Sequence, residues 1–353
     1  MKILVRGTNW IGDSVMSVPA LKELRRIFLG AQITLHTRTW ADGLFSNADF
    51  IDELVTFDKA KWAAKDVYDN SRFLKGDQYD LAVIFPNSFE SAATSFLSKI
   101  PRRFGYNKDL RGLLLTDAIA VPEWKNRRHE VYYYLNLVSE IEKGLLGRDT
   151  VSETYPDTSL PVTEEQRSLA IGILAANGIE GPFVAVGVGS TNSIIKRWPH
   201  ERFITLINSI VSRQDIKVVL LGSKEESATA EGIISAAGTG VYDLTGKTSL
   251  AEAVGILSLA DLMISNDMGL AHIAPAVGTP TIALFGPTNP ETTRPWGDNV
   301  LVLRQDVRCV FCEKGDQTPR HICERWPAVT DVLMAASAIL TKMPVHIDLA
   351  SVI

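Results

Sequence analysis

Several features that would place this 353-residue chain in a special class are scarce or missing. Its three cysteines, an odd number in a long chain, fit reduced thiols in the cytosol rather than a disulfide framework. No apolar run reaches the ~18 residues of a membrane span, and the start MKILVRG reads directly as a strand, so we expect neither a spanning helix nor a signal peptide. The 36 basic and 41 acidic side chains leave a net charge of −5, which argues against bulk nucleic-acid binding. Internal repeats and low-complexity tracts are missing as well.

What remains is the composition of an ordinary globular protein, with 46% hydrophobic and 22% charged residues. The chain is long for one hydrophobic core, and both halves alternate short apolar strands with helical periodicity. We therefore expect the α/β class, with two doubly wound sheets. The predicted organisation is a first domain over residues 1–155, a linker and connecting helix over 156–181, a second domain over 182–330, and a terminal helix and tail over 331–353. The linker lies in a polar segment that carries Pro156 and Pro161.

The stretch DLMISNDMGLAHIAPAVGTPTIALFGPTNPETTRPWG, residues 261–297, predicts a parallel βαβ unit. Ligands of such sheets bind beyond the carboxyl ends of the strands, so the turn around Asp267 and Gly269 is a candidate site. Gly269 lets the backbone approach a ligand, and the following helix start favours an anionic group. Asp267 repels phosphate, and this combination favours a ligand with both hydroxyls and phosphates, such as a nucleotide sugar.

The first glycine-rich loop follows the strand at residues 3–5 and runs from Gly7 to Ser14. It has the spacing of a P-loop, but Asp13 occupies the position of the lysine, which argues against a P-loop ATPase on charge grounds. Two interpretations of Asp13 stay open here: a helix N-cap and a functional carboxylate.

Basic side chains gather in two places of the first domain. The first cluster is RRFGYNKDLRG, with Arg102, Arg103, Lys108 and Arg111, and the second run contains Lys125, Arg127, Arg128 and His129. Either these residues form a solvated surface, or they make an electropositive rim that attracts an anionic substrate despite the net negative charge.

The segments ILVRGTNWIGDSVMSVPAL, IKRWP, SNDMGLAHIAPAVGTPTIALFGPT and FPNSFESAATSFLSKIPRRFGYNKDLRGLLL together resemble glycosyltransferase family 9, the bacterial heptosyltransferases. Within the family, the last segment resembles the branch that adds the second heptose of the lipopolysaccharide inner core. The resemblance implies a GT-B fold, in which two Rossmann-like domains face each other across a cleft and the terminal helix returns to the first domain.

The same resemblance implies an inverting, metal-independent transferase without a cofactor. It would move heptose from ADP-heptose onto the heptose of a lipid A-Kdo-heptose acceptor. It would work in the cytoplasm, at the inner face of the inner membrane, with peripheral membrane contact through the acceptor. The carboxy-terminal domain would bind the donor and the amino-terminal domain the acceptor.

Carried onto this sequence, the family pattern makes Asp13 the catalytic base. Lys196 matches the phosphate-binding lysine, its alternative being a surface lysine beside a packed Trp198. Ser190 and Thr191, on the preceding loop, are candidate donors to phosphate, although TNSII departs from the usual Gly-Pro-rich loop. Acceptor binding is expected of Arg102, Arg103, Lys108 and Arg111.

Donor contacts are also implied in the second domain. Glu226 matches the residue that holds the ribose hydroxyls, its alternative being a first-turn glutamate favoured by the helix dipole. Asp267 matches the carboxylate that binds heptose hydroxyls, with the Gly269 and Leu270 amides near the diphosphate. His272 is either a ligand contact or a packed helix histidine.

Cys309, Cys312, His321 and Cys323 have the composition of a structural zinc site, but their spacing is unusual and reduced thiols need no metal. Three other functions stay open: a family member with a different core acceptor, a GT-B nucleotide-sugar epimerase, and a non-catalytic nucleotide-sugar-binding protein. ADP release that depends on added acceptor distinguishes transfer from the last two.

Overall fold

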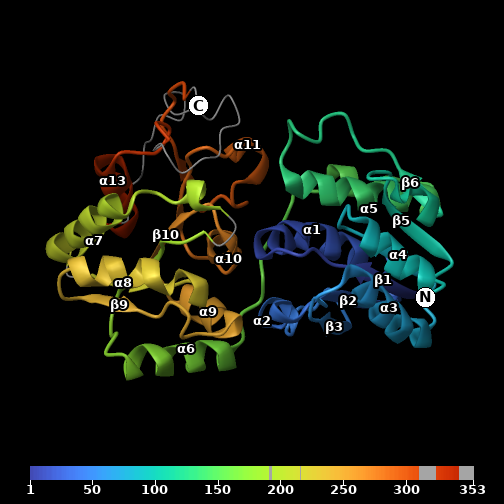
Figure 1. The fold of residues 1–353 in the computed structure, drawn as a ribbon, viewed down its shortest axis with the longest axis horizontal. Coiled ribbons are helices and arrows are strands. Elements are labelled where there is room, and N and C mark those ends of the chain that lie inside the picture. Colours follow the sequence, from blue (N-terminus) through green and yellow to red (C-terminus); the bar gives the residue numbers. More distant parts are fainter. Residues whose placement is uncertain (191–192, 215, 310–322, 342–353) are drawn as a thin grey trace. The chain divides into compact units, whose positions relative to one another are not determined.

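The computed structural model describes residues 1–190, 193–214, 216–309 and 323–341. The chain divides into an amino-terminal unit, Met1–Thr158, and a carboxy-terminal unit, Ser159–Ile353 (Figure 1). The division falls two residues after Pro156, the first of the two prolines of the predicted linker.

The amino-terminal unit contains a parallel sheet with the strand order β3-β2-β1-β4-β5-β6. The strands are β1 (Lys2–Arg6), β2 (Gln32–Arg38), β3 (Glu53–Phe57), β4 (Leu81–Ile84), β5 (Arg102–Tyr106) and β6 (Asp117–Ile119). The chain builds outward from β1 to β3, returns, and builds in the other direction from β4. The strand order therefore reverses between β1 and β4, whose carboxyl ends flank the crevice in which doubly wound sheets bind ligands.

Helices cover both faces of this sheet. They are α1 (Ile11–Ile27), α2 (Asp42–Phe45), α3 (Ala63–Leu74), α4 (Phe89–Leu97) and α5 (Glu130–Leu146), with short 3-10 turns η1 (Thr39–Ala41), η2 (Lys75–Asp77), η3 (Arg111–Leu114) and η4 (Val151–Glu153). Helix α1 packs against α5, and α3 packs against α4 (Figure 1). Helix α5 ends where Gly147 adopts the left-handed conformation, φ 66°, that a helix C-terminus often requires.

The carboxy-terminal unit repeats this plan with the order β12-β11-β10-β7-β8-β9, again all parallel. Its strands are β7 (Phe183–Gly187), β8 (Lys217–Leu220), β9 (Val241–Asp243), β10 (Leu262–Asn266), β11 (Thr281–Leu284) and β12 (Val300–Leu303). Here the order reverses between β7 and β10. The predicted α/β class with two doubly wound sheets is confirmed.

The helices of this unit are α6 (Glu164–Ala176), α7 (His200–Gln214), α8 (Ser227–Ala236), α9 (Leu250–Leu257), α10 (Gly269–Ala276), α11 (Pro290–Thr293) and α13 (Val329–Leu340), with the 3-10 turns η5 (Ile194–Lys196) and η6 (Lys224–Glu226). Helix α6 opens with a capping box between Thr163 and Gln166, and α9 opens with one between Ser249 and Glu252. These caps fix where the two helices begin.

The terminal helix α13 has a defined packing within the carboxy-terminal unit, and its predicted return to the first domain stays a prediction. Helix α13 packs on α7, β10 and β11, all in its own unit. Its buried residues Val332, Ala335 and Ala336 belong to the same hydrophobic cluster as Trp198 and Phe203. The apolar stripe of this helix therefore completes the core of the carboxy-terminal unit.

Candidate functional site

Asp13 lies in the first turn of α1, directly after the loop that leaves β1. The N-cap residue of α1 is Trp10, so the N-cap interpretation of Asp13 is wrong. The Asp13 carboxylate is partly buried, and its Oδ1 accepts a hydrogen bond of 3.2 Å from the hydroxyl of Tyr134 on α5. The carboxylate thus lies at the helix end that favours negative charge, beside the point where the strand order of the sheet reverses.

The loop before Asp13 is fixed by close packing against β2. A Cβ atom at Gly7 would lie 2.8 Å from the Cβ of Thr37, so only glycine fits there. The Thr37 hydroxyl donates to the carbonyl of Thr8, and the hydroxyls of Thr8 and Ser14 share a hydrogen bond of 2.6 Å. These contacts hold the start of α1, and with it Asp13, at a defined position above β1.

Tyr134 is a residue that the sequence did not single out. Its ring packs edge-on against Phe85, with centroids 5.4 Å apart, and only 6% of the side chain is exposed. Burial, together with the negative charge of Asp13, raises the pKa of the Tyr134 hydroxyl far above its usual value of 10. The phenol therefore keeps its proton and remains a hydrogen-bond donor to Asp13.

In the carboxy-terminal unit, Lys196 and Asp267 form an ion pair although 71 residues separate them. The Nζ of Lys196, at the end of η5, lies 2.7 Å from the Oδ2 of Asp267, which follows β10. The lysine side chain is 30% exposed and the aspartate 7%. A cation and a carboxylate that were predicted as separate donor contacts thus meet at one point.

Asn266, the last residue of β10, holds this region together and was not assigned a role from the sequence. Its side chain is fully buried. The Nδ2 group donates to the carbonyls of Val188 (2.8 Å) and Gly189 (3.1 Å), while Oδ1 accepts from the backbone N–H of Trp198 (3.0 Å). The side-chain amide of Asn266 therefore joins the end of β10 to the segment that follows β7 and to the segment that follows η5. The strand order of the sheet reverses at this place, between β7 and β10.

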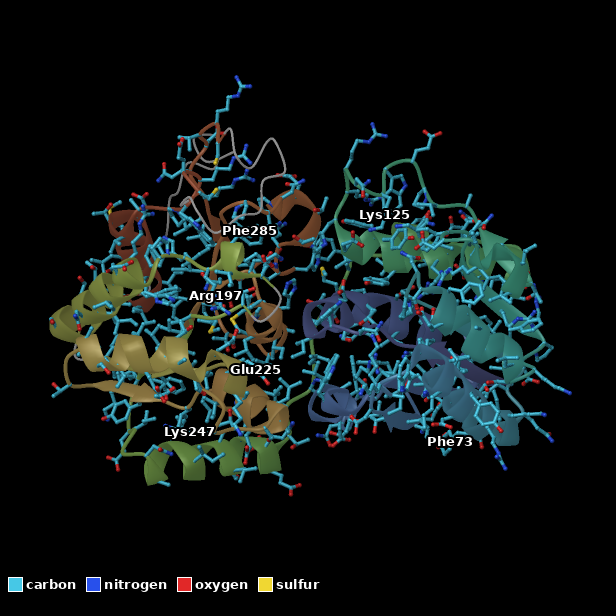
Figure 2. The ribbon with its side chains drawn as sticks, in the orientation of Figure 1. Phe73, Lys125, Arg197, Glu225, Lys247 and Phe285 are labelled. Atoms are coloured by element: carbon cyan, nitrogen blue, oxygen red, sulfur yellow. The ribbon has the colours of Figure 1, made fainter. Side chains whose placement is uncertain are left out.

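Ser190 and Arg197 add a second tie on the same side. The guanidinium of Arg197, labelled in Figure 2, donates from Nε and Nη2 to the carbonyl of Ser190 at 3.3 and 3.1 Å. Ser190 is itself buried, with 3% of its surface exposed. The backbone of Ser190 is thereby fixed, and its expected contact with phosphate stays a prediction.

Glu226 lies beneath two glycines. A Cβ atom at Gly189 would lie 1.9 Å from its Oε1, and one at Gly222 would lie 2.7 Å from its Oε2. The carboxylate is 1% exposed and accepts a 2.8 Å hydrogen bond from the Ser223 N–H in a capping box. The helix-start interpretation therefore describes its local contacts, and binding of ribose stays a prediction.

Gly269 and Leu270 begin α10, and the N-cap residue Met268 offers no side-chain hydrogen bond. His272, one turn into the helix, is 5% exposed, and its Nδ1 has no hydrogen-bond partner among the described residues. The pKa of His272 is lowered to about 4, mainly by burial; the charge of Asp267 opposes this shift and that of Lys196 adds to it. The imidazole is therefore neutral at pH 7.

The predicted basic rim of the amino-terminal unit is largely engaged within the protein. Arg102 pairs with Asp117 at 2.6 Å, and Arg103 donates to the backbone carbonyl of Leu114 at 2.7 Å. Lys108 is exposed, as expected of a rim residue.

Arg111 contradicts the predicted rim, because its side chain is 0% exposed. It donates from Nε to the Tyr106 carbonyl at 2.9 Å, from Nη1 to the Pro86 carbonyl and from Nη2 to the Asn87 Oδ1 at 3.3 Å. Burial lowers its pKa to about 10. Arg111 is thus an internal anchor for the turn that follows β5.

Three predicted site residues, Thr191, Cys312 and His321, lie outside the described residues. Cys309 and Cys323 are buried in the hydrophobic cluster of the carboxy-terminal unit. Among the described residues, no helix has both the length and the apolar composition that crossing a bilayer requires.

Comparison with known proteins gives a consistent set of relatives. The profile of glycosyltransferase family 9 (heptosyltransferase) matches residues 68–321. The chain is 28% identical over 326 residues to lipopolysaccharide heptosyltransferase 2 of Salmonella typhimurium, covering 90% of this chain and 91% of that protein.

Solved structures agree with this. The Escherichia coli ADP-heptose lps heptosyltransferase II superposes with a TM-score of 0.81 at 25% identity, covering 97% of this chain and 99% of that one. A family 9 glycosyl transferase from Veillonella parvula superposes with a TM-score of 0.83 at 20% identity, covering 97% of each chain, which shows the shared fold.

Proposed function

The chain belongs to glycosyltransferase family 9, the heptosyltransferases, and from this premise we propose that it transfers heptose from ADP-heptose onto the heptose of the lipopolysaccharide inner core, with a lipid A-Kdo-heptose acceptor. Relatives named lipopolysaccharide heptosyltransferase 2 that align over 90% of the chain favour this activity over an epimerase or a binding protein.

The observation that carries the donor half of the proposal is the ion pair between Lys196 and Asp267. An ADP-sugar has a diphosphate, which binds cations and helix starts, and a sugar, whose hydroxyls bind carboxylates. Lys196 and the first N–H groups of α10 would bind the diphosphate, and the Asp267 carboxylate would bind the sugar hydroxyls. Both lie where the strand order of the carboxy-terminal sheet reverses, between β7 and β10.

Asp13 supplies the base in this proposal. The acceptor hydroxyl oxygen forms a bond to the anomeric carbon of the heptose while the bond from that carbon to the diphosphate breaks. The hydroxyl proton passes to the Asp13 carboxylate, and ADP leaves with the bonding electrons. Because the attack occurs opposite the leaving group, the configuration at the anomeric carbon inverts, and no step uses a metal ion.

Tyr134 supports this assignment of Asp13. Its hydroxyl donates to Oδ1 of the carboxylate and stabilises the ionised form, which is the form that a base requires. A carboxylate held in one orientation loses less entropy when it meets the acceptor hydroxyl.

The acceptor carries a lipid, so we place the reaction at the inner face of the inner membrane, with peripheral contact made through the acceptor. The cytoplasmic location is part of this proposal and is supported by the family to which the chain belongs. Fractionation of cells into soluble and membrane-bound protein, with and without acceptor synthesis, measures this contact.

Turnover of Asp13→Asn tests the proposal. The substitution keeps the size of the side chain and can still accept from Tyr134, but removes the base, so we expect acceptor-dependent ADP release to fall by ~10²-fold or more. ADP binding, measured by calorimetry, should stay unchanged, because Asp13 belongs to the amino-terminal unit and the proposed donor residues belong to the carboxy-terminal unit. Wild-type turnover in Asp13→Asn would refute its role as base, and wild-type ADP release that does not depend on acceptor would refute heptosyl transfer itself.

A further inference from the structure

Two arginines lie side by side at the carboxyl edge of the amino-terminal sheet. Arg6 ends β1, Arg38 ends β2, and both guanidiniums lie over the ring of Phe57, the last residue of β3, at 4.4 and 4.7 Å from its centroid. The three strands are neighbours in the sheet, and Arg38 pairs in register with Phe57. We call Arg6 and Arg38 the arginine pair.

Neither member of the arginine pair forms an ion pair with a carboxylate among the described residues. Arg6 is 7% exposed, and its Nη1 donates to the backbone carbonyls of Gly7 and His36, both at 3.2 Å. Burial and the charge of Arg38 lower the pKa of Arg6 to about 9, with Asp66 acting in the opposite direction.

Two carboxylates act on the arginine pair through their charge, Asp66 on both arginines and Asp58 on Arg38. The Oδ1 of Asp66 already accepts from the Ala60 N–H at 3.2 Å and from the Asn70 Nδ2 at 3.4 Å. Asp58 is exposed to solvent, where its field is screened. Within the part of the chain that the structure describes, no carboxylate lies within ion-pair distance of either guanidinium. The two like charges are therefore compensated only from a distance, and an anion bound between them would lower the cost of burying them together.

Arg38 also keeps an unused donor. Its Nη1 is buried and has no hydrogen-bond partner among the described residues. Folded proteins rarely leave a buried donor unpaired, and an anion bound at this point would supply the acceptor that the Nη1 group lacks. His36 adds no charge here, because its ring is buried and burial, with Arg6, lowers its pKa to about 3.

The arginine pair is joined to the loop that carries the proposed base. The Nε of Arg38 donates to the Oδ1 of Asn9 at 3.1 Å, and Arg6 donates to the carbonyl of Gly7. Gly7 and Asn9 belong to the loop between β1 and α1, whose first turn contains Asp13. An anion held by the arginine pair would thus be bound next to the segment that positions the base.

We propose that Arg6 and Arg38 form a subsite for an oxyanion of the acceptor, a carboxylate or a phosphate. A guanidinium matches both groups with two parallel N–H donors, and two guanidiniums together neutralise a charge that the net-negative protein would otherwise repel. The inference rests on the proposed heptosyl transfer and moves the acceptor's anionic contact from the predicted rim to this inner pair.

Steady-state kinetics of Arg38→Gln test the subsite. We expect the acceptor KM to rise by about tenfold or more, since a charge-assisted contact is lost, and Arg38→Lys to recover part of it. The ADP Kd should stay within about twofold of the wild-type value. Arg148→Gln is the matched control, because that guanidinium of the same unit is already paired with Glu142 and has no assigned role in binding, and its acceptor KM should not change.

Modified acceptors identify the anion. If the arginine pair binds a phosphate, removing the acceptor phosphates abolishes the difference between wild type and Arg38→Gln; if it binds a carboxylate, amidation of the Kdo carboxylates does so. An equal acceptor KM in wild type and Arg38→Gln would overturn the subsite. So would a loss in Arg38→Gln of the same size for charged and neutralised acceptors, since that marks a purely structural role.

A binding measurement keeps the subsite testable apart from turnover. With saturating ADP present, inorganic phosphate should raise the melting temperature of the wild type more than that of Arg38→Gln. Equal stabilisation would count against the subsite even in an active enzyme. If instead the wild type transfers no heptose but phosphate still distinguishes the two proteins, the proposed function fails while the anion site stands.

Discussion

Replacing Asn266 with alanine removes the side chain that joins three segments of the carboxy-terminal unit. The lost contacts are those to the carbonyls of Val188 and Gly189 and to the N–H of Trp198, with lengths of 2.8, 3.1 and 3.0 Å. Asn266 is 0% exposed, so the three backbone groups are left without partners in a place that water reaches poorly.

The size of the effect follows from these three groups. A buried donor or acceptor that loses its partner costs roughly 1–3 kcal/mol, and at the lower end three of them give about 3 kcal/mol. At about 2–4 °C for each kcal/mol in a domain of this size, the melting temperature of the carboxy-terminal unit should fall by roughly 6–12 °C.

Urea unfolding with two probes, plus hydrogen exchange, measures this loss. Two probes are needed because a chain of two units need not unfold in one step. Hydrogen exchange should show the Trp198 amide losing protection specifically. Asn177→Ala is a suitable control, since that exposed side chain makes one hydrogen bond, to the Ile173 carbonyl, and its loss should cost less than about 1 kcal/mol. A destabilisation by Asn266→Ala of less than about 1 kcal/mol, with full protection of the Trp198 amide, would refute this reasoning.

Three further predictions concern the charged groups of the two units. Lys196→Ala should weaken ADP and ADP-heptose binding together, whereas Asp267→Ala should keep or tighten ADP binding and impair transfer from ADP-heptose; calorimetry with both ligands checks this, and parallel losses for the two variants would contradict it. Tyr134→Phe should lower kcat by about tenfold without changing ADP affinity, since it removes one hydrogen bond to a carboxylate; an unchanged kcat would show that the contact does not matter for turnover. The pKa values of His272 (about 4) and His36 (about 3) lie below the 6.5 of an unfolded histidine, so the unfolded chain binds protons first and the free energy of unfolding should fall as the pH drops from about 6.5 toward 4, by up to about 1.4 kcal/mol per pH unit for each histidine. Urea unfolding at pH 7, 6 and 5 measures how steeply the free energy of unfolding depends on pH. This dependence should be shallower in His272→Gln than in the wild type, and an equal dependence would disprove the low pKa of His272.

The central strands could be predicted from the sequence because they are buried on both faces. Strands β1, β4, β7 and β10 consist mainly of consecutive buried apolar residues, a pattern that is typical of inner parallel strands. Strand β5 and the outer strands β6, β9 and β12 were not predicted. Strand β9, for example, is the three-residue segment Val241–Asp243, half-exposed throughout, and such a segment carries no periodicity. Its strand conformation depends on pairing with β8.

The candidate site could be predicted only one residue at a time. The sequence indicated Asp13, Lys196 and Asp267, but no spacing reveals an ion pair between residues 71 positions apart. Tyr134 reads as part of a run of aromatic residues on a helix, and its contact with Asp13 arises only because α5 packs against α1.

Arg111 was predicted to lie on an exposed basic rim, but it is buried. Arginine is rarely buried, so a basic cluster predicts a surface. Here the backbone carbonyls of Tyr106 and Pro86 replace water around the guanidinium, and these come together only in the folded unit.

The close packing of Glu226 against two glycines also limits which substitutions positions 189, 222 and 226 can accept. Neither Gly189 nor Gly222 has room for a Cβ atom while the glutamate carboxylate occupies its place. A change at either glycine is therefore tolerated only after position 226 has acquired a shorter side chain, so the order in which substitutions arise matters. Homologues that keep glutamate here should therefore keep both glycines. Loss of the glutamate would release Gly189, whereas a Cβ atom at Gly222 would still lie 3.2 Å from the Thr245 side chain.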